Sequence, residues 1–241
     1  MLALTGLALI LPVLWFGIPL ILRRWQVRGL TSYCAAHRVI VLTYDDGPSP
    51  ETTTALAHLL ARRGAVASFF MIGARAATHP SLVARLLADG HEVGSHTQSH
   101  LNAWKASPGA PVRDLWAGQR TLMHLGAPAG PFRPPYGKTT LATQLALWIG
   151  RCPTAFWTID TRDSWEQPRS VAEVLDMIMR QGGGVVLMHD FALAPRGAAD
   201  HDHPDHILKM TDAILDLAAA YDFSVRRFGD MGGSAENGRK R

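Results

Sequence analysis

The fold is indicated most clearly by RVIVLTYDDGPSP, residues 38–50. Its first half is apolar, rich in β-branched residues and uninterrupted, which is typical of a strand buried on both faces of a parallel sheet. Two adjacent carboxylates, Asp45 and Asp46, follow at once, and the turn pair Gly47-Pro48 comes next. Like charges this close repel each other, so something positive is expected beside them. The stretch therefore predicts a buried strand that ends in a charged site.

Outward from this stretch, short apolar runs alternate with amphipathic ones. Strands are expected at 38–44, 65–73, 91–96, 154–160, 184–190 and 223–230, and helices at 51–64, 80–90, 112–126, 139–150, 170–183 and 203–222. Such alternation predicts an α/β fold, in which helices cover a mostly parallel sheet that is either a barrel or doubly wound. No G-x-G-x-x-G motif follows any of these strands, so a dinucleotide-binding fold is disfavoured.

Composition is ordinary for a globular protein and excludes few functional classes. The chain has 241 residues, enough for one domain with a large core, and 47% of them are apolar. The net charge is +4, but the sequence has no Lys/Arg block interleaved with aromatic residues, so no nucleic-acid partner is expected.

Polar residues collect where the predicted strands end. In parallel α/β folds the carboxyl ends of the strands are where the chemistry takes place. The residues at these positions are Asp45, Asp46, His96, Arg133, Asp160, Asp163 and His189.

A metal site is predicted from the spacing of two histidines. His96 and His100 are four residues apart, so on a helical turn their side chains share a face and can hold a divalent metal. One of the pair Asp45 and Asp46 can complete a two-His, one-carboxylate set with open positions. The other carboxylate would then be free to act as a general base on a water activated by the metal.

Five motifs give a specific resemblance. TYDDGPS (43–49), HTQSH (96–100), RPPYG (133–137), DTRDSW (160–165) and LMH (187–189) occur in this order. Together they resemble the motifs of the polysaccharide deacetylase family, the NodB-type domain of family 4 carbohydrate esterases. The resemblance spans residues 38–230 and implies a distorted (β/α) barrel.

The resemblance also implies a metal centre and a base. Asp46, His96 and His100 would bind the metal, most often Zn²⁺, although the same ligands also accept Co²⁺, Ni²⁺ or Mn²⁺. Asp45 would be the general base, and Arg133 would pair with it and orient it.

The remaining motifs imply an acid and a substrate pocket. His189 would protonate the leaving amine, and the backbone N–H of Tyr136 would help to stabilise the oxyanion. Leu187 would line the pocket for the acetyl methyl group. A histidine that must be charged at neutral pH needs a carboxylate partner, for which Asp163 is the candidate.

One motif departs from the family pattern. The family usually has an aromatic residue directly after the second aspartate of its fourth motif, whereas here Ser164 separates Asp163 from Trp165. Whether Asp160 or Asp163 partners His189, and whether Trp165 lines the substrate groove, therefore stays open.

The N-terminus predicts a membrane anchor. Residues 2–22 carry no charge and are about long enough to cross a bilayer as a helix, so residues 1–24 are expected to form a single-pass anchor in the inner or plasma membrane. Arg23, Arg24 and Arg28 follow the span, which favours a cytoplasmic catalytic domain, whereas a wall polymer as substrate requires an outside one. The tail, residues 231–241, is expected to be disordered.

These observations lead to three functional hypotheses. The favoured one is a metal-dependent N-deacetylase of N-acetylated polysaccharide, such as peptidoglycan or a chitin-like chain. The second applies the same chemistry to a lipid-linked amino sugar at the membrane, removing an acetyl or formyl group. The third is a non-catalytic carbohydrate-binding protein with the same fold.

Overall fold

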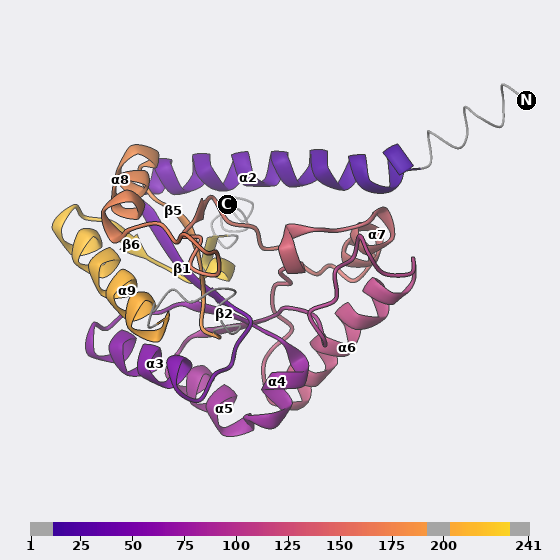
Figure 1. Ribbon diagram of the computed structural model, residues 1–241, viewed down its shortest axis with the longest axis horizontal. Coiled ribbons are helices and arrows are strands. Elements are labelled where there is room, and N and C mark those ends of the chain that lie inside the picture. Colours follow the sequence, from indigo (N-terminus) through magenta and orange to yellow (C-terminus); the bar gives the residue numbers. More distant parts are fainter. Residues whose placement is uncertain (1–11, 192–202, 232–241) are drawn as a thin grey trace, which may run out of the picture.

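A parallel sheet forms the centre of the molecule. The computed structural model describes residues 12–191 and 203–231 (Figure 1). Within them, a six-stranded sheet has the order β3-β2-β1-β5-β4, and β6 pairs with the first residues of β1. Its strands are β1 (Val39–Asp45), β2 (Ser68–Met71), β3 (Glu92–Ser95), β4 (Ile159–Asp160), β5 (Gly184–His189) and β6 (Ser224–Val225).

The sheet curves into a distorted barrel. Isolated parallel bridges join Ser95 at the end of β3 to Phe132, and Phe132 to Thr154. Thr154 belongs to the segment that ends in β4, and β4 pairs with β5. Backbone pairing therefore continues from β3 through Phe132 and Thr154 to β4 and β5. The first two of these links are single bridges rather than full strands. This agrees with the barrel that the motifs imply.

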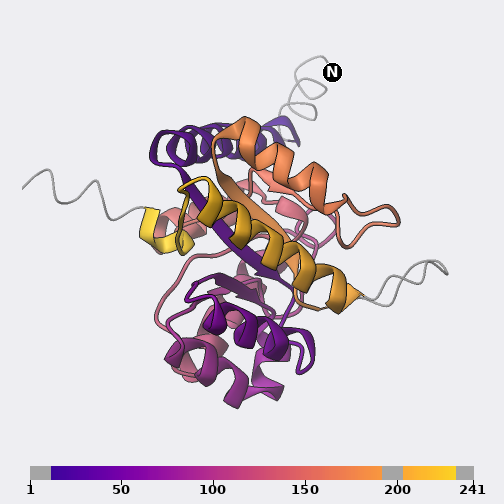
Figure 2. The same ribbon diagram turned by 90° about the vertical axis from the view of Figure 1, so that its left-hand side faces the viewer.

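Helices cover the outside of the sheet. They are α3 (Thr52–Arg62), α4 (Gly73–Thr78), α5 (Pro80–Ala88), α6 (Ala110–His124), α7 (Leu141–Ile149), α8 (Val171–Gln181) and α9 (His203–Ala220), with short 3₁₀ turns η2 (Pro135–Gly137) and η3 (Phe228–Met231). Figure 2 shows α8, α9 and α3 side by side along one flank of the sheet, where α9 contacts the other two.

The predicted alternation of strands and helices is confirmed, with three differences. The expected strands at 154–160 and 223–230 shorten to the two-residue β4 and β6. The segment 154–160 bridges Phe132 at one end and β5 at the other, so only its last part lies in one ladder. Helix α4 is additional, because its short GARAAT sequence carries no apolar periodicity that would predict it.

Alternation along β1 positions the first catalytic candidate. Every residue of β1 is buried. Ile40, Leu42 and Tyr44 pack with the outer helices in the main core, whereas Val39 and Val41 belong to a second cluster. Because side chains alternate along a strand, Thr43 and Asp45 share the face of Val39 and Val41. This face of β1 is therefore apolar at its start, at Val39 and Val41, and polar at its end, at Thr43 and Asp45.

The N-terminal helix differs from the prediction. After the π-helical turn η1 (Val13–Gly17), α2 (Ile18–His37) runs along the barrel and ends at Arg38, whose left-handed φ is 51°. Its Cys34 is buried in the second cluster. No helix in residues 12–191 or 203–231 is long and apolar enough to cross a membrane. The predicted span at 2–22 is thus unsupported, because α2 carries Arg23, Arg24 and Arg28 midway; residues 2–11 lie outside the described part.

The folded unit extends beyond the predicted domain at its N-terminal side. The predicted domain, residues 38–230, contains every strand that the structure describes, but α2 packs against it and belongs to the same folded unit. Of the predicted tail, residues 231–241, only Met231 is described, as the last residue of η3.

Candidate active site and metal centre

The candidate residues meet at the carboxyl end of the sheet. Asp45 is the last residue of β1 and His189 the last of β5, and they are register partners across the two strands. Asp46 follows β1, and His96 follows β3. The order of the strands thus brings together residues that are far apart in the sequence, as the strand-end pattern predicts.

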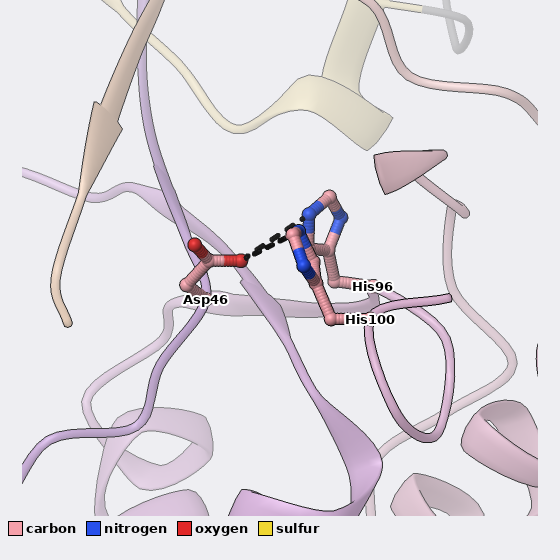
Figure 3. Close-up of side chains that lie close together, drawn as sticks. All are labelled: Asp46, His96 and His100. Carbon is pink, nitrogen blue, oxygen red and sulfur yellow. Dashed lines mark ion pairs between the residues drawn. The ribbon is translucent and has the colours of Figure 1, made fainter. Parts of the chain in front are cut away.

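Three of these residues form a cluster of metal-ligating groups. Ligand atoms of Asp46, His96 and His100 all lie within 4.8 Å of one another. Asp46 Oδ1 is 3.4 Å from His96 Nε2 and 3.2 Å from His100 Nε2. Figure 3 shows both imidazoles on the same side of the Asp46 carboxylate, with dashed lines for the two ion pairs. The same oxygen is buried and has no hydrogen-bond partner. A buried carboxylate oxygen without a donor is expensive, so the cluster needs a cation.

The protonation state of His96 favours a metal over a proton as that cation. His96 Nδ1 is 2.8 Å from the carbonyl oxygen of Arg133 and must donate to it, which leaves a lone pair on Nε2. Burial lowers the pKa of His96 to about 3, so its imidazole is neutral at pH 7. Burial also lowers the pKa of His100. Two neutral imidazoles and one carboxylate fit a tetrahedral Zn²⁺ site with an open position.

The backbone around the cluster is shaped to aim its ligands. Asp46 and His100 both have left-handed backbones, with φ of 74° and 60°. Thr97, also left-handed with a φ of 66°, accepts a hydrogen bond on its hydroxyl from the backbone N–H of His100. These turns lift the ligands away from the strand direction, so that Asp45 and Asp46 point to different partners.

Asp45, the other carboxylate of the adjacent pair, has a different environment. Arg133 is completely buried, and its Nη1 donates to Asp45 Oδ1 at 2.8 Å and to Thr43 Oγ1 at 2.7 Å. The guanidinium also lies over the ring of Phe70, 4.1 Å from its centroid. Burial raises the pKa of Asp45, although Arg133 opposes the shift. Asp45 is therefore fixed in place yet able to accept a proton.

A third group contains a histidine paired with an aspartate. His189 Nδ1 is 2.9 Å from Asp163 Oδ1, and the backbone N–H of His189 donates to Asp163 Oδ2 at 2.7 Å. Burial lowers the pKa of His189, but Asp163, with help from Asp45 and Asp46, raises it to about 10. Burial alone would raise the pKa of Asp163, but contact with His189 and His203 outweighs it and lowers that pKa. The imidazole is protonated at neutral pH, with Nε2 left to donate.

The aspartate that contacts His189 is Asp163, not Asp160. Asp160 Oδ1 accepts a hydrogen bond from the backbone N–H of Arg162, whereas Asp163 is the one that contacts His189. Trp165 is 61% exposed, and the Arg162 guanidinium lies 5.1 Å from its ring centroid. Its part in a substrate groove stays a prediction.

Two other predicted residues lie near the centre. The ring of Tyr136 is 4.9 Å from that of His100, and its φ of 59° is left-handed. Leu187 is buried in β5, two residues before His189. Their roles toward an oxyanion and an acetyl group stay predictions.

Sequence reasoning missed two residues that support the site. Asp190 is buried, accepts a hydrogen bond from Thr53 Oγ1, and has a pKa raised by burial to about 7. His203 Nε2 is 3.4 Å from Asp163 Oδ2. The motif HDHPDH, residues 201–206, is a weak signal for a second metal site, and only the folded chain shows that its His203 faces the acid pair.

Comparisons with known proteins agree with this geometry. The family model described as polysaccharide deacetylase matches residues 32–148. A chitooligosaccharide deacetylase from Azorhizobium caulinodans is 34% identical over 63% of this chain and 73% of its own length. A peptidoglycan-N-acetylglucosamine deacetylase from Bacillus cereus is also 34% identical, over 64% of this chain and 73% of its own.

Solved structures show the same fold. A family 4 carbohydrate esterase from Streptomyces lividans, in complex with acetate, has a TM-score of 0.66 at 25% identity, covering 78% of this chain and 91% of that one. The peptidoglycan deacetylase PdaC from Bacillus subtilis has a TM-score of 0.67 at 25% identity, covering 83% and 92%. The chain therefore belongs to the polysaccharide deacetylase family. It is a hydrolase of the class that removes acyl groups from carbohydrate amides.

Proposed function

We propose that this protein is a metal-dependent N-deacetylase that hydrolyses the acetamido group of N-acetylated sugars in a polysaccharide, either peptidoglycan or a chitin-like chain. One observation carries the proposal. A three-ligand metal cluster, a carboxylate held by Arg133 and an imidazole held by Asp163 all lie at one end of the barrel. Named relatives act on chitooligosaccharide and on peptidoglycan, which supports these two substrate classes.

The reaction needs three things that the site can supply. An amide is a poor electrophile with a poor leaving group, so water must be activated, an oxyanion stabilised and the nitrogen protonated. A divalent metal held by Asp46, His96 and His100 would act as a Lewis acid toward water and the acetyl carbonyl. The chain's own residues carry the protons.

Asp45 is the base of the reaction. It takes a proton from the attacking water as the new C–O bond forms at the acetyl carbon. Its raised pKa favours proton uptake, and Arg133 holds Oδ1 in place through the transfer. The backbone N–H of Tyr136 donates to the developing oxyanion, for which its left-handed turn beside His100 is suited.

His189 is the acid that completes hydrolysis. As the C–N bond breaks, its Nε2–H passes to the amide nitrogen, so acetate and the free amino sugar leave. Asp163 keeps the imidazole protonated beforehand and orients it through Nδ1. Leu187 would contact the acetyl methyl group, and Trp165 would offer its exposed ring to a neighbouring sugar.

Acetate release tests the proposal. The full chain, purified and stripped of metal, should release acetate from chitooligosaccharides or peptidoglycan only after Zn²⁺, Co²⁺, Ni²⁺ or Mn²⁺ is restored. Release from a lipid-linked amino sugar alone would transfer the assignment to that substrate. Stoichiometric metal binding without turnover on any of these compounds would leave only a carbohydrate-binding role and overturn the proposal.

A further inference from the structure

Helix α7 exposes an unusual apolar surface. Trp148 is 79% exposed, Ile149 74% and Leu145 50%, and all three lie on one side of a nine-residue helix, at i, i+3 and i+4 spacing. Large apolar side chains exposed together mark an interaction site more often than a chance surface. The catalytic site described above makes no use of these residues.

The N-terminal helix exposes a second apolar group. Trp25 is 67% exposed and Ile21 52%, and they are neighbours four residues apart on α2. Arg24 and Arg28, both exposed, occupy the adjoining positions of the same side. Further toward the N-terminus, Val13 of η1 is 66% exposed.

The two helices are in contact, so their exposed residues lie on neighbouring elements. Helix α7 contacts both η1 and α2, and Figure 1 shows it below the N-terminal part of α2. We refer to Val13, Ile21, Trp25, Trp148 and Ile149 as the apolar face.

The two sequence segments that carry the apolar face have charge of one sign. No acidic residue occurs before Asp45 in the sequence, and none occurs between Lys138 and Ile159, the segment that contains α7. The same two segments contain Arg23, Arg24, Arg28, Arg38, Lys138 and Arg151. An apolar face with a basic border complements an anionic surface that has an apolar interior.

We propose that the apolar face docks on an anionic phospholipid membrane, with α2 and α7 lying in the interface rather than crossing it. Tryptophan and arginine side chains partition into the headgroup region, and aliphatic side chains reach the acyl boundary beneath it. A second copy of the chain fits less well, because a symmetric interface through α2 would bring Arg24 and Arg28 of both copies together.

Docking would fix the active site relative to the membrane. The Arg23 side chain of α2 lies against Gly137 of the RPPYG motif. A Cβ atom added to Gly137 would be only 2.8 Å from Arg23 Cζ. The ring of Phe16 in η1 meets Trp104 edge-on at 5.4 Å. The helix that touches the lipid is thus the helix that touches the site.

Vesicle binding tests the proposal directly. The full chain is sedimented with vesicles of phosphatidylcholine alone or mixed equally with phosphatidylglycerol. We expect binding to the anionic vesicles, weakened about tenfold or more by R24Q/R28Q and by W25E/W148E. Tyr221→Glu, which changes an exposed aromatic residue just past the C-terminal end of α9, is the matched control and should bind like the parent chain.

A second measurement separates docking from folding and from catalysis. Brominated lipids should quench tryptophan fluorescence of the parent chain more than that of W25E/W148E, and acetate release from a soluble oligosaccharide should be equal for both. Equal vesicle binding by the parent and W25E/W148E would overturn the proposal. So would no binding by the parent, or a dimer in solution that W148E dissociates.

Discussion

Two buried aspartate–cation pairs lie beside the cluster of metal-ligating groups. The carboxyl pKa is raised in one pair and lowered in the other. Asp45 pairs with Arg133, and burial leaves the carboxyl with a raised pKa. Asp163 pairs with His189, and its carboxyl has a lowered pKa while that of the imidazole rises to about 10. Both carboxylates are less than a tenth exposed, so burial alone does not distinguish them.

The number of donors on each carboxylate explains the difference. Asp163 accepts hydrogen bonds from the His189 ring, its backbone N–H and Thr161, and His203 adds a fourth contact. Asp45 has Arg133 as its one donor in the described residues. Hydrogen bonds to the charged form lower a carboxyl pKa, so the donor-rich aspartate stays ionised and the donor-poor one can accept a proton. In the proposed mechanism, the same residue type thus supports the acid in one pair and is the base in the other.

Removing the base should have the largest effect. Asp45→Asn leaves Asp46, His96 and His100 in place, so Zn²⁺ should still bind with one-to-one stoichiometry by calorimetry. Turnover should fall by about 10³–10⁴-fold, near the upper range for a lost acid–base group. Activity within tenfold of the parent would mean that Asp45 is not the base.

Removing the cation of the first pair should act on folding as well. Arg133→Met leaves Asp45 buried without its donor, which should cost about 3–5 kcal/mol in the free energy of unfolding, measured in urea. Adding D45N to R133M should restore part of that loss, because no uncompensated charge then remains. A double variant no more stable than R133M would show that the two residues are not coupled.

Changing the second pair should alter the pH dependence. Below about pH 10 the His189 imidazole is charged and can donate; above it the proton is lost and turnover falls. In Asp163→Asn, only Asp45 and Asp46 still oppose the effect of burial on the pKa of His189. The alkaline limb of kcat should therefore move from about pH 10 to about pH 7 or below. At pH 8 the loss should be about tenfold or more. An unchanged alkaline limb would assign it to another group.

The smallest effect is expected at the neighbouring aspartate. Asp160→Asn changes a residue of the same motif that does not contact His189, and Asn can still accept the hydrogen bond from the Arg162 N–H. Its kcat and pH profile should stay within about twofold of the parent. A shift of the alkaline limb in this variant would contradict the assignment of Asp163.

The sequence was informative where local pattern and strand order suffice. The apolar run of β1 and the polar residues after each strand are enough to place Asp45, His96 and His189 at one edge of the sheet. The membrane span that the lack of charge predicts at residues 2–22 is unsupported in the described residues, where helix α2 continues through three arginines to His37. The partners of Asp163 are fixed by tertiary contacts that no periodicity carries, so neither the contact of His203 nor the exclusion of Asp160 could be predicted.

The left-handed turns of the metal cluster have a thermodynamic consequence. Asp46, Thr97, His100 and Tyr136 all hold positive φ without being glycine, at a cost on the order of 1 kcal/mol each. The buried Asp46 Oδ1, which has no hydrogen-bond partner, adds a further cost. A metal that binds only the folded chain offsets both, by about 4 kcal/mol at a thousand times its Kd. The metal that the proposed reaction needs then also stabilises the fold. Removing it with a chelator should therefore lower Tm even when no substrate is present.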